Sequence, residues 1–154
     1  MRIIALTQGK VSLIDDGDFE MLSYYKWHAV RYREPSGEWW YARSKIGGKS
    51  VRMHHLITGD NFVDHKDGDG LNNTRLNLRP CTPSQNMANT GSRGGTSRHK
   101  GVSWRSAKRR WAVAIMADNR QYFLGYFEDE EEAAIAANEG YRTLHGDFAR
   151  LNTI

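Results

Sequence analysis

A polar stretch past the middle of the chain, NTGSRGGTSRHK at residues 89–100, most constrains what this sequence can fold into. It is rich in Gly, Ser, Thr and basic residues and has no apolar periodicity, a composition typical of a linker. Because domains of about 50 to 70 residues can fold alone, the 154-residue chain has room for one module on each side. We therefore predict a first domain over 1–88, a flexible basic linker over 89–99 and a second domain over 100–154.

Composition indicates a folded protein with a polyanionic partner. Apolar residues make up 39% of the chain and charged residues 26%, which supplies enough core-forming material to exclude wholesale disorder. The formal net charge is +4, and residues 93–110 carry several Lys and Arg side chains with no acid among them. Basic side chains that neutralise phosphates gain from counterion release. The segment 93–110 therefore favours a nucleic acid as partner.

The cysteine count and the N-terminus indicate the compartment. Cys81 is the single cysteine, so no internal disulfide can form and nothing argues for an oxidising environment. No apolar run approaches the roughly 18 residues of a membrane span, and the start MRIIALTQGK lacks a signal-peptide pattern. We expect an intracellular, cytoplasmic protein with no membrane association and no small-molecule cofactor.

The first 50 residues alternate short apolar runs with turn residues, which predicts strands and hairpins. The apolar runs are Ile3–Leu6, Lys10–Ile14 and Trp39–Lys45. Between them, residues 18–27 place apolar side chains at three-residue spacing behind a possible cap at Asp18, which predicts one short helix. This part of the chain is expected to be a small α+β unit.

The C-terminal part predicts three strands and a helix. The strands are expected at 101–105, 111–116 and 121–127, with alternation in the middle strand that buries Trp111, Val113 and Ile115 on one face. Asp118-Asn119 marks a hairpin turn. A helix follows, with Asp129 and Glu132 as a capping box, Gly146 as the stop, and a stripe made of Ala134, Ala137, Tyr141 and Leu144. The expected fold class is α+β, ending in a three-stranded antiparallel sheet packed on one C-terminal helix.

The segment 64–86, DHKDGDGLNNTRLNLRPCTPSQN, holds the residue types that hydrolyse phosphodiesters. That reaction needs an activated water, neutralised phosphoryl oxygens and a stabilised leaving alkoxide, which one divalent metal and one base can supply. Asp64 is the candidate metal ligand, His65 the candidate base, and Asn86 a candidate neutral oxygen ligand. Mg²⁺ at phosphate sites commonly has only one or two protein oxygens, with phosphate and water completing its shell.

Other interpretations of this segment remain open. Asp67-Gly68-Asp69 begins like a calcium loop, but Leu71 and Leu78 stand where that loop needs an oxygen ligand and its closing Glu. Zinc could be held by four residues that lack the paired spacing of a finger, namely His54, His55, His65 and Cys81. A loop rich in Asp, Asn and Gly can also simply form turns.

The phrase VDHKDGDGLNNTRLNL at 63–78, followed by Asn86, resembles the HNH endonucleases of the ββα-metal superfamily, particularly those of homing and phage enzymes. The resemblance implies a ββα-metal nuclease core, Mg²⁺ (or Mn²⁺) as cofactor, Asp64 and Asn86 as metal ligands and His65 as the base that activates water. Asn77 would brace the loop through backbone hydrogen bonds. If a phage encodes the protein, it would act in a bacterial host.

Upstream, MHHLI resembles the usual entry sequence of that family. We expect His54 to support the site or contact DNA, and a purely structural role for His54 is an equal alternative. His55 stands where Arg is frequent, so a phosphate contact there is in doubt.

Residues 98–152 resemble the DNA-binding domain of the plant ethylene-response-factor (Apetala) type, on Lys100-Gly101-Val102, the WAVAI strand and the EEEAAIAANE helix. The resemblance implies a sheet that enters the major groove while the helix packs behind it. Ala114 and Met116 replace the charged residues usual on the middle strand, so the plant recognition sequence does not carry over. The expected DNA-binding residues are Arg93, Arg98, Lys100, Arg105, Lys108, Arg110, Gln121, Phe123 and Tyr126.

These observations favour a metal-dependent DNA endonuclease whose first domain cuts double-stranded DNA and whose second domain holds it, as a monomer or a homodimer. Two rival hypotheses remain. One is a DNA-binding regulator with an inactive nuclease motif, and the other is a zinc-stabilised nucleic-acid module without chemistry.

Overall fold

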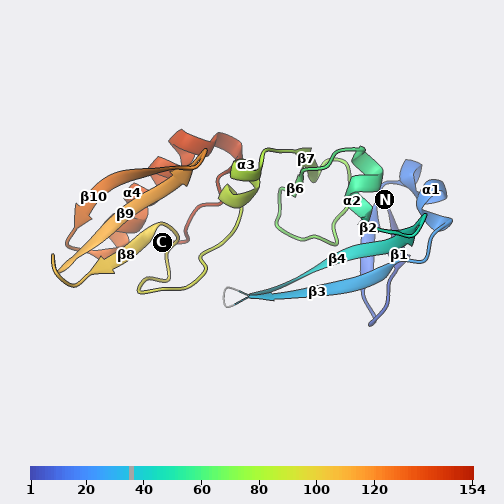
Figure 1. Ribbon diagram of the computed structural model, residues 1–154, viewed down its shortest axis with the longest axis horizontal. Coiled ribbons are helices and arrows are strands. Elements are labelled where there is room, and N and C mark those ends of the chain that lie inside the picture. Colours follow the sequence, from blue (N-terminus) through green and yellow to red (C-terminus); the bar gives the residue numbers. More distant parts are fainter. Residues whose placement is uncertain (35–36) are drawn as a thin grey trace. The chain divides into compact units, whose positions relative to one another are not determined.

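The computed structural model describes residues 1–34 and 37–154 (Figure 1). Its internal contacts form two compact units. Unit 1 consists of Met1–Arg33 and Gly37–Cys81, and unit 2 contains Thr82–Ile154. No helix in the described residues is long and apolar enough to cross a membrane.

Unit 1 is built from three small sheets and two short helices. The strands are β1 (Arg2–Ala5), β2 (Val11–Ile14), β3 (His28–Glu34), β4 (Gly37–Ile46), β5 (Lys49–Arg52), β6 (Val63–His65) and β7 (Leu78–Pro80). They pair as β1-β2, β3-β4-β5 and β6-β7. The helices are α1 (Phe19–Ser23) and α2 (Met53–Thr58). The strands expected in the first 50 residues and the short helix behind Asp18 are thus confirmed.

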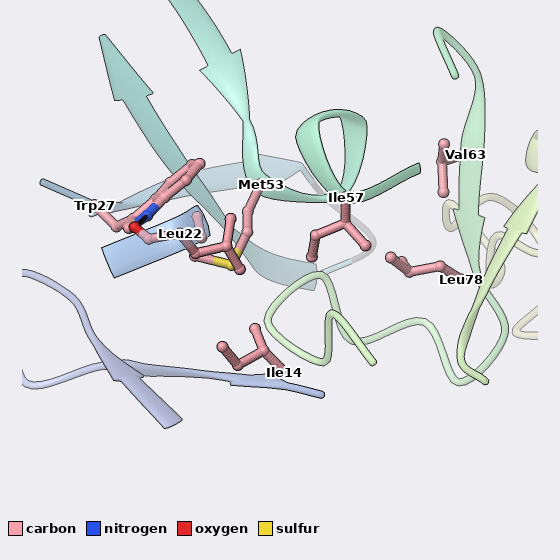
Figure 2. Packing of buried hydrophobic residues seen from close by; sticks show 8 residues of the cluster. Ile14, Leu22, Trp27, Met53, Ile57, Val63 and Leu78 are labelled. Atoms are coloured by element: carbon pink, nitrogen blue, oxygen red, sulfur yellow. Dashed lines mark hydrogen bonds between the residues drawn. The ribbon is translucent and has the colours of Figure 1, made fainter. Parts of the chain in front are cut away.

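A single apolar cluster holds these elements together (Figure 2). Leu22 from α1, Ile14 from β2 and Met53 from α2 are fully buried. Ile57 on the same helix and Leu78 at the start of β7 extend the cluster towards β6. The strand pair β6-β7 is only three residues long on each side, so this packing stabilises it more than its own ladder does.

Unit 2 contains α3 (Pro83–Ala88), β8 (Val102–Arg105), β9 (Arg110–Ala117), β10 (Arg120–Phe127) and α4 (Glu130–His145). The strands form one antiparallel sheet in the order β10-β9-β8, and α4 covers one face of it (Figure 1). Val113 and Ile115 pack with Ala134, Ala137 and Tyr141, and Trp111 lies against them. The expected sheet, its buried face and the helix stripe are confirmed, as is the α+β class.

The turn and the helix ends predicted around this sheet are also present in the structure. Asp118 and Asn119 both have positive φ, as a tight hairpin turn between β9 and β10 requires. The Asp129 carboxylate accepts hydrogen bonds from the backbone N–H groups of Glu131 and Glu132, which caps α4. Gly146 ends the helix with a φ of 54°.

The boundary between the units differs from the one expected from composition. The contacts divide at Cys81–Thr82, so helix α3 groups with unit 2. Its last residue, Ala88, is buried, and the Ala88 carbonyl accepts from the Lys100 ammonium and from the Arg150 N–H. The stretch 89–99, expected to be a flexible linker, contributes two buried residues to unit 2: the Ser97 hydroxyl donates to Glu130, and the His99 N–H donates to Ser97.

Candidate active site

The segment between β6 and β7 is a long loop that is fastened to β2. The strands pair with Asp64 opposite Arg79 and His65 opposite Leu78. The Leu13 N–H donates to the Leu71 carbonyl at 2.9 Å, and the Asn73 N–H donates to the Leu13 carbonyl at 2.8 Å. These two backbone bonds hold the loop against the edge of β2, so its polar side chains have defined positions.

Asp64 lies in a buried ion pair with Arg79, its cross-strand partner. Oδ2 of Asp64 accepts from Nε of Arg79 at 2.8 Å and from Nη2 at 2.7 Å. The side chains are only 5% and 14% exposed, respectively. Two nearly desolvated charges at this distance depend on each other, because either one alone would be an uncompensated charge in a poorly solvated place.

His65 ends β6 and is 5% exposed. Its Nε2 lies 3.2 Å from Oδ1 of Asn73, a residue that is completely buried. The Asn73 amide nitrogen donates to the Ser12 hydroxyl at 2.8 Å, and that hydroxyl donates to the Leu71 carbonyl at 2.9 Å. A hydrogen-bonded chain thus runs from β2 through the loop to the imidazole of His65.

The donors and acceptors in this series of hydrogen bonds can be assigned from the Leu71 carbonyl, where it ends. The Leu71 carbonyl can only accept, so the Ser12 hydroxyl donates to it and accepts from the Asn73 amide nitrogen. Oδ1 of Asn73 therefore faces His65 and accepts, which assigns the proton of the neutral imidazole to Nε2. The lone pair of His65 is then on Nδ1. Sequence analysis did not identify the role of Asn73 or Ser12, because Ser12 is 61 positions away from its partner.

Aromatic rings surround His65. The His54 ring lies 4.8 Å from it, edge to face, and the Tyr41 ring lies 5.9 Å away. Burial, together with the neighbouring His65 and His55, lowers the pKa of His54 from 6.5 to about 2. Burial also lowers the pKa of His65 below 6.5, against the opposing effects of the Asn73 hydrogen bond and nearby carboxylates. Both imidazoles are therefore neutral at pH 7, as an acceptor of a proton must be.

Asn77 joins the two ends of the loop. Its amide nitrogen donates to the Asn72 carbonyl and to Oδ1 of Asp67, and its amide oxygen accepts from the Asp67 N–H. Asp67 also accepts from the Asp69 N–H, and Asp69 from the Leu71 N–H. The two carboxylates thus form local turns, as the simplest interpretation of this sequence expects.

The loop also depends on one close approach. Gly70 is buried, and a Cβ at that position would overlap the Trp40 carbonyl and the Tyr41 ring on β4. Only glycine allows the loop backbone to reach β4 there. Tyr41 in turn contacts both His54 and His65, so the same contact positions the aromatic surroundings of the imidazole.

The two expected metal ligands fall in different units. Asp64 belongs to unit 1, whereas Asn86 is an exposed residue of α3 in unit 2. A carboxylate and an amide oxygen are hard donors that suit Mg²⁺ or Mn²⁺ and leave most of the coordination shell to phosphate and water. The donor chemistry therefore fits a hard divalent ion.

Zinc fits less well. Across residues 1–34 and 37–154, no group of three or more His, Cys, Asp and Glu side chains is arranged to hold a metal ion. His54 instead packs edge to face against both His55 and His65. This packing argues against the four-ligand zinc alternative, which needs imidazole nitrogens that converge on one point.

Most of the expected DNA-binding residues lie on the face of the β8–β9–β10 sheet opposite α4 or at its edge. Arg105 is opposite Arg110 at one end of β8-β9, and Gln121 is opposite Met116 on β9-β10. Exposed side chains in this set are Arg105, Lys108, Arg110, Gln121, Phe123 and Tyr126. Arg110 forms an exposed ion pair with Glu128 at 2.8 Å, an interaction that DNA phosphates can replace at small cost.

The three basic residues before the sheet have different surroundings. Arg93 and Arg98 are exposed, where phosphates could reach them. The Lys100 ammonium donates to the carbonyls of Ala88 and Thr90 and lies 4.1 Å from the centre of the Tyr141 ring. Burial lowers the pKa of Lys100 to about 8. Lys100 therefore stabilises the packing of unit 2, which reduces what it can contribute to DNA.

The chain is similar in sequence to a mimivirus protein and to a phage protein. The chain is 31% identical over 148 residues to an uncharacterized HNH endonuclease of Acanthamoeba polyphaga mimivirus, covering 90% of this chain and 76% of that protein. It is 33% identical over 93 residues to Protein 3.8 of Escherichia phage T7, covering 58% of this chain and 74% of that protein. No family profile matches the chain, and no solved structure matches it.

His65 is a buried histidine that follows Asp64 on a short strand, and this strand leads into an Asn-rich loop. With the similarity to the mimivirus protein over most of both chains, the chain belongs to the HNH endonuclease family.

Proposed function

We propose that the protein is a metal-dependent DNA endonuclease in which His65 activates the attacking water. The observation that carries this proposal is the hydrogen-bonded chain from Leu71 through Ser12 and Asn73 to Nε2 of His65. It holds a neutral imidazole in one tautomer and one orientation, with the lone pair on Nδ1. A base needs both properties before a substrate arrives.

The proton removed from water would be taken up at Nδ1 of His65. The resulting imidazolium would keep its Nε2–H donated to Asn73, and the carboxylates of Asp64 and Asp67, which raise the pKa of His65, would favour the charged form. The rings of His54 and Tyr41 pack against the His65 imidazole.

Asp64 and Asn86 are the proposed ligands of Mg²⁺ or Mn²⁺. When bound, the ion would neutralise charge on the phosphoryl oxygens and on the leaving alkoxide. Asp64 contributes the negative charge, and Arg79 holds its carboxylate in place from the opposite strand. Asn77 keeps the loop closed through its bonds to Asp67 and Asn72.

Unit 2 is the proposed DNA-holding module, as the resemblance to the ethylene-response-factor type implies. Exposed Arg105, Lys108 and Arg110 at one end of the sheet supply positive charge for phosphates. A tethered binder raises the local concentration of DNA at a catalytic unit that itself makes few contacts.

A DNA-binding regulator with an inactive nuclease motif is the second candidate, and one observation favours it. Oδ2 of Asp64 accepts from both Nε and Nη2 of Arg79, so an ion that binds this oxygen must share it with a guanidinium. This arrangement would suit a motif that has kept its fold and lost its metal.

The test is a plasmid-nicking assay with Mg²⁺ and with Mn²⁺, run beside a binding assay in EDTA. The endonuclease proposal predicts relaxed or linear products from the wild type, and none from His65→Ala at equal DNA binding. Tight binding without cutting under any divalent ion would support the regulator.

A further inference from the structure

The sheet face opposite α4 has an apolar centre. Val113 and Ile115 of β9 are completely buried against α4, so the residues that alternate with them point to the other side. On β10, Phe123 is opposite Ala114 and Tyr126 is opposite Ala112. Ala112 itself is only 3% exposed. We call the remaining set the apolar strip: it consists of Ala114, Met116, Phe123 and Tyr126.

A β-bulge gives the apolar strip its shape. The register between β9 and β10 shifts between Phe123 and Gly125, which inserts Leu124 as an extra residue. Phe123 and Tyr126 consequently share one face, with ring centroids 5.0 Å apart. Phe123 is 56% exposed and Met116 57%. Large apolar side chains gathered in the open on one face mark a surface that binds a partner.

The charges around the apolar strip identify the class of partner. Arg105 and Arg110 lie opposite each other at one end of the sheet, and Lys108 follows Arg105 in the turn to β9. All three are exposed. The sheet face would therefore complement a polyanion of a particular kind. Its charged groups would contact these basic residues, and apolar groups between the charges would contact the apolar strip. Duplex DNA has both features in its major groove.

We propose that the apolar strip recognises the 5-methyl groups of thymine in the major groove. Guanine is selected by Arg or Lys and adenine by Asn or Gln. On this face such side chains, Arg105, Arg110 and Gln121, lie beside the ends of the apolar strip, and the strip between them offers apolar contacts alone. Thymine is the base whose groove edge presents a methyl group, which Ala and Phe side chains contact. The inference rests on the DNA binding proposed for unit 2 and adds the feature of the DNA that unit 2 distinguishes.

The experiment compares thymine with uracil, which pairs identically and lacks only the methyl group. Duplexes bound by the full chain are first selected from a random library in EDTA, so that nothing is cut. The selected sequences are then synthesised with thymine or with uracil, and their affinities are measured at one salt concentration. Removing a buried methyl group is expected to weaken binding roughly three- to fivefold per contacted base.

Variants make this a double-mutant cycle between the side chain and the methyl group. Phe123→Ala is expected to bind the thymine duplex more weakly and to lose much of the preference for thymine over uracil. Met116→Ala is a second variant at an equally exposed position. Phe62→Ala is the matched control, because Phe62 is also 56% exposed but lies in unit 1, and it should keep the full preference.

Equal affinity of the wild type for both duplexes would overturn the inference and leave DNA binding intact. A preference that survives in both Phe123→Ala and Met116→Ala would also overturn it, as would tighter binding to the single strands than to the duplex. Failure to enrich any duplex would instead refute the DNA binding proposed for unit 2, and the inference with it.

Discussion

Replacing Arg79 by Leu should destabilise unit 1 strongly. The change removes both guanidinium hydrogen bonds to Asp64 and leaves a carboxylate that is 5% exposed without its counterion. Breaking a buried ion pair in this way costs about 3–5 kcal/mol. Urea unfolding in EDTA measures this loss in the free energy of unfolding. Arg33→Leu is the matched control, because Arg33 pairs with Glu38 while 70% exposed, and we expect little change in its free energy of unfolding.

The same variant tests the proposed metal ligand. In Arg79→Leu a divalent ion can neutralise Asp64 without competing with a guanidinium, so Mg²⁺ or Mn²⁺ should raise its free energy of unfolding more than that of the wild type. Replacing Asp64 by Asn as well should abolish the difference. A free energy of unfolding of Arg79→Leu within about 1 kcal/mol of that of the wild type would show that the ion pair does not stabilise unit 1 as expected. Metal that stabilises Arg79→Leu no more than the wild type would contradict the role of Asp64 as a ligand.

Two further predictions concern the hydrogen bonds that orient His65 and the buried imidazole of His54. Asn73→Leu should lower the cleavage rate roughly a hundredfold with DNA binding unchanged, because the His65 imidazole loses its orientation; an unchanged rate would show that the hydrogen-bonded chain has no part in cutting. The pKa of His54 is about 2 in the folded protein, so the unfolded chain takes up the proton first and stability is lost as pH falls below about 6.5. Between pH 7.5 and 5.0 the loss is about 2 kcal/mol for this residue, measured by urea unfolding and reduced in His54→Gln; an equal loss in both proteins would contradict the assignment.

Unit 2 could be predicted in some detail because its signals are local. Alternation along Trp111 to Met116, the turn at Asp118-Asn119 and the cap at Asp129 each act over a few residues, and the structure contains all three. The start of helix α3 is marked by a comparable local pattern in the sequence. Thr82 and Gln85 form a complete capping box with Pro83 after the cap, which is a recognisable sequence signature of a helix start.

The active-site geometry could be predicted only in part. The adjacency of Asp64 and His65 is visible in the sequence, whereas the pairing of Asp64 with Arg79 depends on the register of a three-residue ribbon. The contact between Asn73 and Ser12 joins residues 61 positions apart. Such contacts follow from the packing of β2 against the loop, and no spacing rule along the chain encodes them.

Strand-resolved cleavage of the duplexes selected by the full chain, with Mg²⁺ or Mn²⁺ present, tests directly whether the protein is an endonuclease that uses His65. We expect cuts at defined positions on at least one strand, which disappear in His65→Ala and in EDTA although binding persists. Tight binding with no cut on either strand under any divalent ion, or cuts of equal rate in His65→Ala, would contradict it.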